Sequence, residues 1–272
     1  MKNESPPPTS RSQPGATAHE PPPPRTPLLQ LHGVTRRFGG VAALSAVSFH
    51  VNQGEILGII GPNGAGKTTL LNCISGVYRL DAGRIEFDGA PISGLPPHRV
   101  ARLGIGRTFQ VVKPFASMTV RENAAVGALF GASNLPPARA FRAADEVLEL
   151  VGLTGKASLP VPSLTIPDRK RLEVARALAT RPRLLLLDEV MAGLNAVEVD
   201  EALEMVRNVH RSGVTIVLIE HVMRVVVGVC ERVVVLHFGE LLAEGTPAEV
   251  LKDSRVIEAY LGEKYARRAG GG

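Results

Sequence analysis

A glycine-rich stretch that begins at Gly61 has the residue types and the spacing needed to hold a polyphosphate. It fits the pattern of Gly, four residues, then Gly-Lys-Ser/Thr, and it reads Gly61, Pro62, Asn63, Gly64, Ala65, Gly66, Lys67, Thr68. The glycines let phosphate oxygens approach the backbone, whose N–H groups donate at the positive end of a helix. Lys67 is placed to reach the β and γ phosphates, and the Thr68 hydroxyl is placed to ligate Mg²⁺. The stretch therefore predicts a nucleoside triphosphate site, with a plain glycine-rich turn as the alternative.

An acidic pair, Asp188-Glu189, follows the apolar run from Leu184 to Leu187. A buried parallel strand delivers the residues after it to the carboxyl edge of the sheet, where a phosphate loop also lies. We predict that Asp188 holds Mg²⁺ through a water molecule and that Glu189 polarises the water that attacks the γ-phosphate. A solvated strand end is the alternative, and it is the nearby phosphate loop that favours the catalytic interpretation.

Short apolar runs that alternate with helical stretches must position these groups, and this alternation is typical of an α/β sheet protein. Strands are predicted at Glu55 to Ile60, Leu184 to Leu187, Val214 to Ile219 and Arg232 to His237. Between the first and second of them, the region from about Gln110 to Lys170 is predicted to be mainly helical. Arg139 to Val151 is its clearest amphipathic piece.

The N-terminal residues 1–27 differ in composition from the rest of the chain. They hold nine of the 21 prolines and almost no large apolar side chains, so we expect a disordered tail. Residues 28–272 are expected to form one domain, for which a hydrophobic content of 44% over the chain supplies an ample core.

Charge and cysteine content narrow the class of protein. The formal net charge is +5, but basic residues are scattered among acidic ones, which favours an ordinary solvated surface over a nucleic-acid site. Cys73 and Cys230 are too few for a disulfide framework and fit reduced thiols in a cytosol. No apolar run reaches the roughly 18 to 20 residues of a membrane span, and no secretory signal is expected. Any role at a membrane must then come through a partner.

Further landmarks resemble those of ABC ATPases, in the family's order and over nearly all of Leu28 to Glu263. Phe38 occupies the aromatic position that stacks on adenine in the family. Gln110 matches the glutamine that senses Mg²⁺ and joins the catalytic core to the helical subdomain. Ala192-Gly193-Leu194-Asn195 matches the loop that crosses the dimer interface, and His221 matches the histidine that contacts the γ-phosphate. The sequence has no Asn-Lys-x-Asp motif, which disfavours a GTPase.

This resemblance implies a fold and a set of site residues. The fold is an α/β P-loop NTPase core with a mainly parallel sheet, an N-terminal antiparallel β subdomain and an inserted helical subdomain at about 110–170. ATP and Mg²⁺ are the implied ligands. The nucleotide would be held by Phe38, Gly61, Pro62, Asn63, Gly64, Ala65, Gly66, Lys67, Thr68, Thr69 and Asp188. The metal would be held by Thr68, Gln110 and Asp188, and catalysis would use Lys67, Gln110, Glu189 and His221.

Within that superfamily, four short motifs resemble the ATP-binding subunits of branched-chain amino-acid importers. They are Phe38-Gly39-Gly40 with Val41-Ala42-Ala43-Leu44, then Leu71-Asn72-Cys73-Ile74-Ser75-Gly76, Arg107-Thr108-Phe109-Gln110, and Tyr260-Leu261-Gly262-Glu263. Urea and amide importers share much of this pattern. The tail also resembles lipopolysaccharide-export ATPases, which lack the Arg-Thr-Phe-Gln form.

The resemblance implies ATP hydrolysis that powers a bacterial importer, in a protein held at the cytoplasmic face of the cell membrane by partner subunits. The implied partners are transmembrane permease subunits and a second ATP-binding subunit, in a heterodimer or alternatively a homodimer. No nucleic-acid partner is expected. Two other classes stay open, a nucleic-acid-associated ABC ATPase and a regulatory nucleotide-binding module with weak turnover. The first usually carries two cassettes or a long coiled-coil insertion, and this chain has neither.

One motif departs from the family. Where ABC ATPases have the LSGGQ signature that caps the nucleotide of the opposite subunit, this chain reads Leu164-Thr165-Ile166-Pro167-Asp168. Thr165 keeps the hydroxyl, but Pro167 has no N–H to donate and Asp168 brings negative charge close to a phosphate. We expect a damaged signature; the alternative is a loop shifted by one residue, in which the defect is only apparent.

Overall fold

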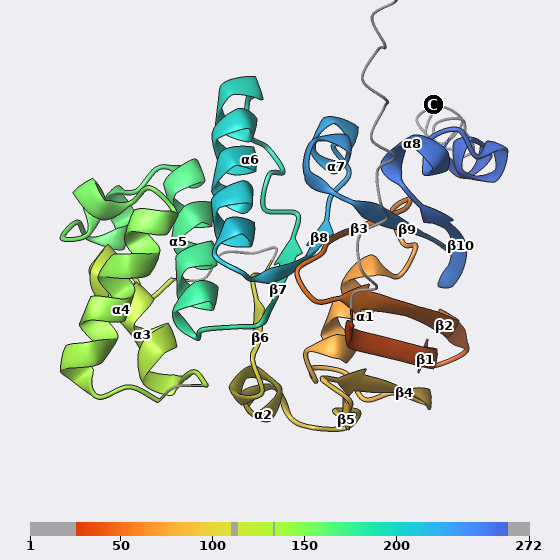
Figure 1. Cartoon of the computed structure of the whole chain (residues 1–272), viewed down its shortest axis with the longest axis horizontal. Coiled ribbons are helices and arrows are strands. Elements are labelled where there is room, and N and C mark those ends of the chain that lie inside the picture. Colours follow the sequence, from red (N-terminus) through yellow and green to blue (C-terminus); the bar gives the residue numbers. More distant parts are fainter. Residues whose placement is uncertain (1–25, 110–113, 133, 261–272) are drawn as a thin grey trace, which may run out of the picture.

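The computed structural model describes residues 26–109, 114–132 and 134–260, which fold into two sheets flanked by helices (Figure 1). Gln110, nearly all of the proline-rich segment and the Leu261-Gly262-Glu263 ending lie outside these residues. The fold is α/β, as the sequence pattern predicts, with an antiparallel N-terminal sheet and a second, mostly parallel sheet, as the family resemblance implies.

The larger sheet in the described part of the chain has six strands in the order β10-β9-β3-β8-β7-β6. Neighbouring strands from β9 to β6 are parallel, and β10 closes the edge as an antiparallel hairpin with β9. All four strands predicted for the core are confirmed. Their bounds, with those of the other two, are β3 Ile56–Ile60, β6 Ile105–Arg107, β7 Leu184–Asp188, β8 Thr215–Ile219, β9 Arg232–His237 and β10 Glu240–Gly245.

The central strands carry apolar side chains on both faces because both faces are covered, which is the rule for parallel sheets. In β7, Leu184 and Leu186 join one hydrophobic cluster, whereas Leu185 and Leu187 join the other. The carboxyl ends of β3, β7 and β8 therefore meet at one edge of a sheet that is fixed from two sides.

The smaller sheet packs over one face of the larger one, with α1 between them (Figure 1). Its order is β2-β1-β4-β5, with all pairs antiparallel. Leu44 of β2, Leu57 of β3 and Leu70 of α1 are fully buried in the same hydrophobic cluster. The bounds are β1 Pro27–Phe38, β2 Val41–Asn52, β4 Ala82–Phe87, β5 Ala90–Pro91 and α1 Lys67–Ile74.

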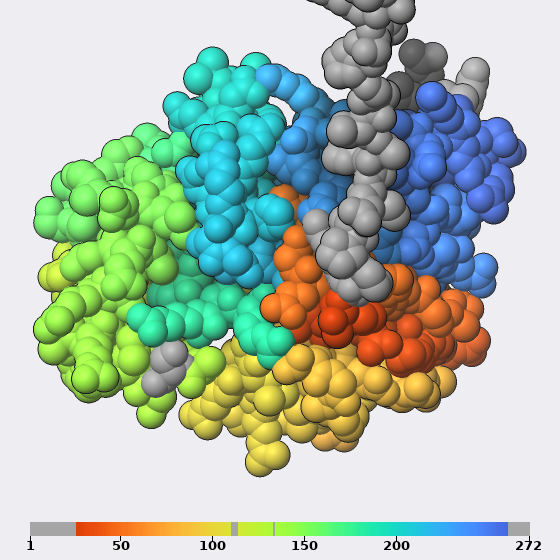
Figure 2. Space-filling model, in the orientation of Figure 1, coloured from red at the N-terminus to blue at the C-terminus, as the bar shows by residue number. Residues whose placement is uncertain are grey.

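A group of helices forms the other flank of the molecule, drawn in green in the space-filling view (Figure 2). It contains α3 Val120–Phe130, α4 Pro137–Leu150 and α5 Ile166–Ala179, with short 3-10 turns η1 Thr154–Lys156 and η2 Val161–Ser163 before α5. Thr119 and Glu122 form a capping box that starts α3. The remaining helices are α2 Pro97–Arg102, α6 Ala196–Arg211, α7 Met223–Val229 and α8 Pro247–Val250. Among the described residues, no helix has both the length and the apolar character needed to cross a bilayer.

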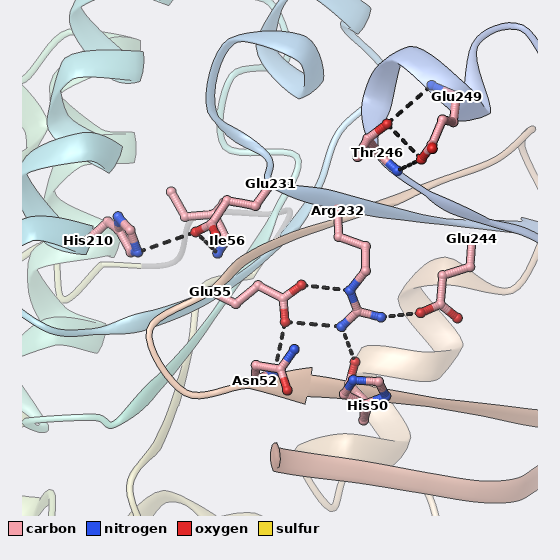
Figure 3. Close-up of polar contacts among 10 residues, drawn as sticks. All are labelled: His50, Asn52, Glu55, Ile56, His210, Glu231, Arg232, Glu244, Thr246 and Glu249. Atoms are coloured by element: carbon pink, nitrogen blue, oxygen red, sulfur yellow. Dashed lines mark hydrogen bonds and ion pairs between the residues drawn. The ribbon is translucent and has the colours of Figure 1, made fainter. Parts of the chain in front are cut away.

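A buried ion pair joins the two sheets at the end opposite the phosphate loop (Figure 3). Arg232, at the start of β9, donates from Nε to Glu55 Oε1 at 2.7 Å and from Nη2 to Glu55 Oε2 at 3.0 Å. The same guanidinium donates to the His50 carbonyl of β2 and to Glu244 of β10. Bidentate pairing of this kind offsets the large desolvation penalty of a buried carboxylate.

Both cysteines are free, as expected, and the structure shows that both are buried. Burial raises the pKa of Cys73 to about 11 and that of Cys230 to about 12. Such thiols remain protonated at neutral pH and act as small core side chains.

Candidate functional site

The phosphate loop runs from the end of β3 into α1, and two of its glycines have no room for a side chain. Gly61 has φ 151° and Gly66 has φ 100°, both in the region that L-residues avoid. A Cβ on Gly61 would lie 2.1 Å from the Leu236 carbonyl oxygen, and one on Gly66 would lie 2.5 Å from the Ala43 carbonyl oxygen. The glycines thus allow the loop to pack closely against β2 and β9.

Lys67 is the first residue of α1, and its ammonium group is folded back into the loop. Nζ donates to the Gly61 carbonyl at 2.7 Å and to the Pro62 carbonyl at 2.9 Å. The side chain is only 7% exposed, so the positive charge is held beside the loop and not out in solvent. The Lys67 ammonium group and the positive end of α1 would both attract a polyphosphate that binds in the loop.

A cavity of about 1080 Å³ lies against the phosphate loop. All nine residues from Gly61 to Thr69 line it, and so do Glu189 and His221 from the ends of β7 and β8. Ala43 of β2 forms part of the same wall. The fold therefore brings together the phosphate loop, Glu189 and His221, as predicted from the sequence, although they are up to 160 positions apart.

Asp188 lies at the end of β7 and is buried, with 1% exposure. Its Oδ2 accepts from Arg107 Nη2 at 3.2 Å, and its backbone N–H donates to Thr108 Oγ1 at 3.1 Å. Arg107 also donates to Asn72 Oδ1 at 2.7 Å and Ser75 Oγ at 2.9 Å, both at the far end of α1. Burial raises the pKa of Asp188, while the charge and hydrogen bond of Arg107 oppose that rise. Arg107 thus ties the strand that carries the acids to the helix that follows the phosphate loop.

The residues fit the Mg²⁺ ion that the sequence implies. Asp188 Oδ1 is buried and, among the described residues, has no hydrogen-bond partner, so one hard oxygen is left over at the end of the strand. Thr68, next to Lys67, is among the residues that line the cavity, and its side chain carries a hydroxyl group. A carboxylate and a hydroxyl beside substrate phosphates are the donor set that Mg²⁺ prefers.

Glu189 is held in a strained conformation beside the cavity. Its φ is +50°, a conformation that costs a non-glycine residue about 1–3 kcal/mol and persists only where the surrounding structure fixes it. Its N–H donates to the Ile219 carbonyl of β8 at 3.0 Å. His221 follows β8 by two residues and is exposed on the cavity wall. The two side chains therefore come from adjacent strand ends, as the parallel pairing of β7 with β8 requires.

Phe38 ends β1 outside the set of residues that line this cavity. Its ring lies edge-on to Tyr78, with centroids 5.2 Å apart, and the Arg36 guanidinium lies 4.7 Å from its centroid. The ring is still 43% exposed. Part of the Phe38 side chain therefore remains accessible to a base, and Tyr78 and Arg36 contact its ring.

Replacing Phe38 with alanine is expected to weaken ATP binding by about 1–3 kcal/mol, the scale of base stacking on an aromatic ring. The phosphate contacts would be untouched. Titration with a fluorescent ATP analogue measures the effect, and Phe130→Ala, which removes a 71%-exposed ring from α3, is the matched control. Unchanged affinity in a folded Phe38→Ala protein would reduce Phe38 to a packing residue.

The segment that stands in place of the family's signature lies at the start of α5, and Thr165 is the N-cap of this helix. The Thr165 hydroxyl donates to Asp168 Oδ2 at 2.8 Å and accepts from Asp168 N–H at 3.3 Å, so it is used within the helix start. Ile166 is 69% exposed, and Pro167 follows it in the first turn. The structure therefore puts a proline and an apolar side chain at the tip of the helix.

Asp168 adds a negative charge at the same tip. It is 5% exposed, and its Oδ2 also lies 2.5 Å from Lys156 Nζ. Burial raises the pKa of Asp168, but the hydrogen bonds from Lys156 and Thr165 and the charges of Lys156 and Arg171 outweigh it and leave the pKa below its ordinary value. A carboxylate in the first turn opposes the positive helix end that would otherwise attract a phosphate.

Two features of the site were not among the residues predicted from sequence. Arg107 stands in the Arg107-Thr108-Phe109-Gln110 motif, but its contact with Asp188 spans 81 positions and has no counterpart in that motif. The C-terminal segment supplies one apolar wall of the cavity, formed by Leu251, Val256, Ile257 and Tyr260. A local motif carries no signal for either contact. Gln110, predicted to be catalytic and metal-binding, lies outside the described residues.

Comparison with known families gives two matches. The ABC transporter family model matches residues 44–192, which contain the phosphate loop, the signature region and the acidic pair. A second model, described as branched-chain amino acid ATP-binding cassette transporter, matches residues 240–266, which include the apolar wall of the cavity.

Similar proteins and structures agree with these matches. The branched-chain amino acid transport ATP-binding protein BraF of Pseudomonas aeruginosa is 41% identical over 251 residues, covering 87% of this chain and 98% of that protein. LivG of Salmonella typhimurium, with the same described role, is 42% identical over 255 residues at the same coverage. Among solved structures, the ADP conformation of an ATP-binding cassette from an ABC transporter superposes with a TM-score of 0.79. It is 31% identical, covering 87% of this chain and 99% of that one.

Proposed function

The chain belongs to the ABC transporter family, and we propose from this premise that it is the ATP-hydrolysing subunit of a bacterial importer for branched-chain amino acids. The observation that carries the ATPase part is the shared cavity of phosphate loop, Glu189 and His221. The solute class is supported by the described role of the relatives and by the match at residues 240–266. That match favours the importer over the lipopolysaccharide-export alternative.

Hydrolysis in this site is a matter of positioning and electrostatics. The loop N–H groups and Lys67 hold the phosphates, and His221 reaches the γ-phosphate. Glu189 orients a water for attack on the γ-phosphorus, which breaks the bond to the bridging oxygen and gives ADP and phosphate. Mg²⁺, held by Thr68, Asp188 and Gln110, would neutralise phosphate charge when bound. Glu189 lines the cavity beside the phosphate loop.

The subunit works, in this proposal, against a second ATP-binding subunit that differs from it. In such a pair each nucleotide lies between the phosphate loop of one subunit and the signature of the other. The tip of α5 has lost an N–H at Pro167 and carries the charge of Asp168, so it is a poor cap for a partner's γ-phosphate. A homodimer would place two such caps on its two sites, which favours a heterodimer with an intact signature in the partner.

The permease would dock in a groove between the catalytic core and the helical flank. This groove, of about 290 Å³, is lined from α2, β6, α3 and α5, and Phe109 and Phe130 stand at it with 52% and 71% exposure. Exposed aromatic side chains beside a hollow are typical anchors of a protein interface. We expect motion of the helices to reach the permease through the segment 111–118, of which residues 111–113 lie outside the described part of the chain. The chain would therefore be held at the cytoplasmic face of the membrane by its partner.

Replacing Phe130 with serine is expected to weaken assembly with the cognate permease by at least about tenfold, because anchors of this kind contribute about 2 kcal/mol or more. Basal ATP hydrolysis by the isolated subunits should not change, since α3 contributes nothing to the nucleotide cavity. Co-purification from detergent measures the effect, with Val227→Ser, an exposed apolar residue of α7, as control. Equal recovery of permease with both variants would remove the groove from the interface.

ATPase assays separate this function from its rivals. The purified chain with its partner subunits should hydrolyse ATP, and the rate should respond to the permease and not to added DNA or RNA. Stimulation by nucleic acid alone would favour a nucleic-acid-associated ATPase. Turnover that stays negligible with every partner present would favour a regulatory nucleotide-binding module.

A further inference from the structure

Glu220 is a buried carboxyl group that the proposed chemistry does not use. It stands at the end of β8, directly before His221, and has 0% exposure. Burying such a group is costly unless it is hydrogen-bonded. The hydrogen bonds of Glu220 show which segment of the chain it holds in place.

The Glu220 carboxylate is bound to the loop that follows the catalytic carboxylate. Its Oε1 accepts from the Met191 N–H at 2.9 Å. One residue earlier on β8, the Ile219 carbonyl accepts from the Glu189 N–H at 3.0 Å. Residues 189–191 are therefore hydrogen-bonded to two successive residues at the end of β8.

A third contact reaches the same loop from α5. Lys170 donates from Nζ to the Ala192 carbonyl. Burial lowers the pKa of Lys170, and the charges of Glu220 and Glu189 oppose that change. Residues 189–192 are thus fixed between β8 on one side and the helix that carries the signature on the other.

The pKa of Glu220 is raised to about 7, mainly by burial and further by the negative charge of Glu189. The hydrogen bond from Met191 and the positive charge of Lys170 oppose this rise. Both protonation states are therefore populated near neutral pH. A carboxylate and a carboxylic acid can each accept the Met191 N–H through a carbonyl-type oxygen. Position 220 therefore requires a hydrogen-bond acceptor for the Met191 N–H, which a glutamine side chain could also supply.

We propose that Glu220 is a positioning residue for ATP hydrolysis, which holds Glu189 and the Ala192-Gly193-Leu194-Asn195 loop in place by accepting the Met191 N–H. The proposal rests on the proposed function. The strained φ of Glu189 needs such restraint, because a residue in this region persists only where its surroundings fix it. Release of Met191 lets the Glu189 carboxylate drift from the water that it orients, and displacement by about 1 Å costs roughly a hundredfold in rate.

Three variants of the full chain test the proposal. Glu220→Ala removes the acceptor, Glu220→Gln keeps it, and Glu55→Gln alters an equally buried carboxylate in the Arg232 pair at the far end of the sheet (Figure 3). If Glu220→Ala does not fold, Lys170→Met is the substitute. This variant leaves β8 intact and releases the loop from the α5 side. Amide hydrogen exchange of residues 189–195 reports loop anchoring without requiring turnover. Steady-state kinetics with the partner subunits then report kcat and KM.

With Glu220→Ala we expect exchange at Met191 to rise by at least about tenfold, kcat to fall by roughly 10- to 100-fold and KM for ATP to change by less than about twofold. Glu220→Gln should restore both readouts, and Lys170→Met should raise exchange at residues 191–195. Glu55→Gln should leave the loop and kcat unchanged. Equal exchange in Glu220→Ala and Glu55→Gln, or a fall in kcat that glutamine does not rescue, would overturn the proposal. Absence of turnover in the parent protein would instead count against the proposed function, and the exchange result would still decide whether Glu220 anchors the loop.

Discussion

Replacing Glu189 with glutamine should slow ATP turnover by at least about a hundredfold while ATP affinity stays near that of the parent protein. The amide keeps the size of the side chain and removes the charge that orients and activates water, a contribution of about 10²- to 10⁴-fold in comparable sites. The phosphate loop and Lys67 remain intact, and they supply the binding contacts. A closed dimer that retains ATP is the expected species.

Two measurements check this result, phosphate release under saturating ATP and the elution volume of the subunit pair on gel filtration with ATP. Glu204→Gln, which changes an exposed glutamate of α6 that pairs with Arg207 and Arg211, is the control and should match the parent. Hydrolysis at the parent rate by Glu189→Gln, with the partner present, would show that another group activates the water.

The signature of this chain predicts a second large effect, an inequality between the two nucleotide sites of the dimer. ATP on this chain, capped by an intact signature from the partner, should be hydrolysed normally. ATP on the partner would face Ile166, Pro167 and Asp168 instead. Loss of one donor to a developing phosphate charge removes about 2.7–4 kcal/mol of transition-state stabilisation, so that site should run roughly a hundredfold to a thousandfold slower.

Disabling each catalytic glutamate in turn measures the inequality. Glu189→Gln should abolish nearly all activity of the complex, whereas the same change in the partner should cost little. Restoring the signature with Ile166→Gly, Pro167→Gly and Asp168→Gln should raise total turnover by up to about twofold, the gain from a second site of equal rate. Lys156→Gln, which breaks the ion pair with Asp168, is the control for loosening of the helix start. Equal losses from the two single glutamate variants would favour a rearranged but working signature loop.

The sequence could predict the strands and the chemistry of their ends because both signals are local. A phosphate loop is defined by eight consecutive residues, and an acidic pair after an apolar run marks a strand end. Parallel pairing of β7 and β8 then brings Glu189 and His221 to one cavity without further information. The α/β class follows from the same alternation of elements.

Other contacts could not be predicted because they join residues whose spacing in the chain carries no pattern. Arg107 reaches Asp188, Glu220 reaches Met191, and Lys170 reaches Ala192 only after the sheet and α5 have been assembled. The support of Phe38 by Tyr78 likewise depends on where β1 and the end of α1 meet in space. We expect these contacts to position the site residues without reacting themselves, so their residue types give no chemical signal in the sequence.

Leucine uptake into proteoliposomes tests the central claim most directly. The vesicles would contain this chain, its partner ATPase and the permease, with ATP and Mg²⁺ on the side of the ATPase subunits and the cognate binding protein on the other. We predict that leucine accumulates against its gradient only when ATP is present, and that Glu189→Gln in this chain abolishes the accumulation. ATP hydrolysis without accumulation of leucine, isoleucine or valine, or accumulation that continues with Glu189→Gln, would contradict the account.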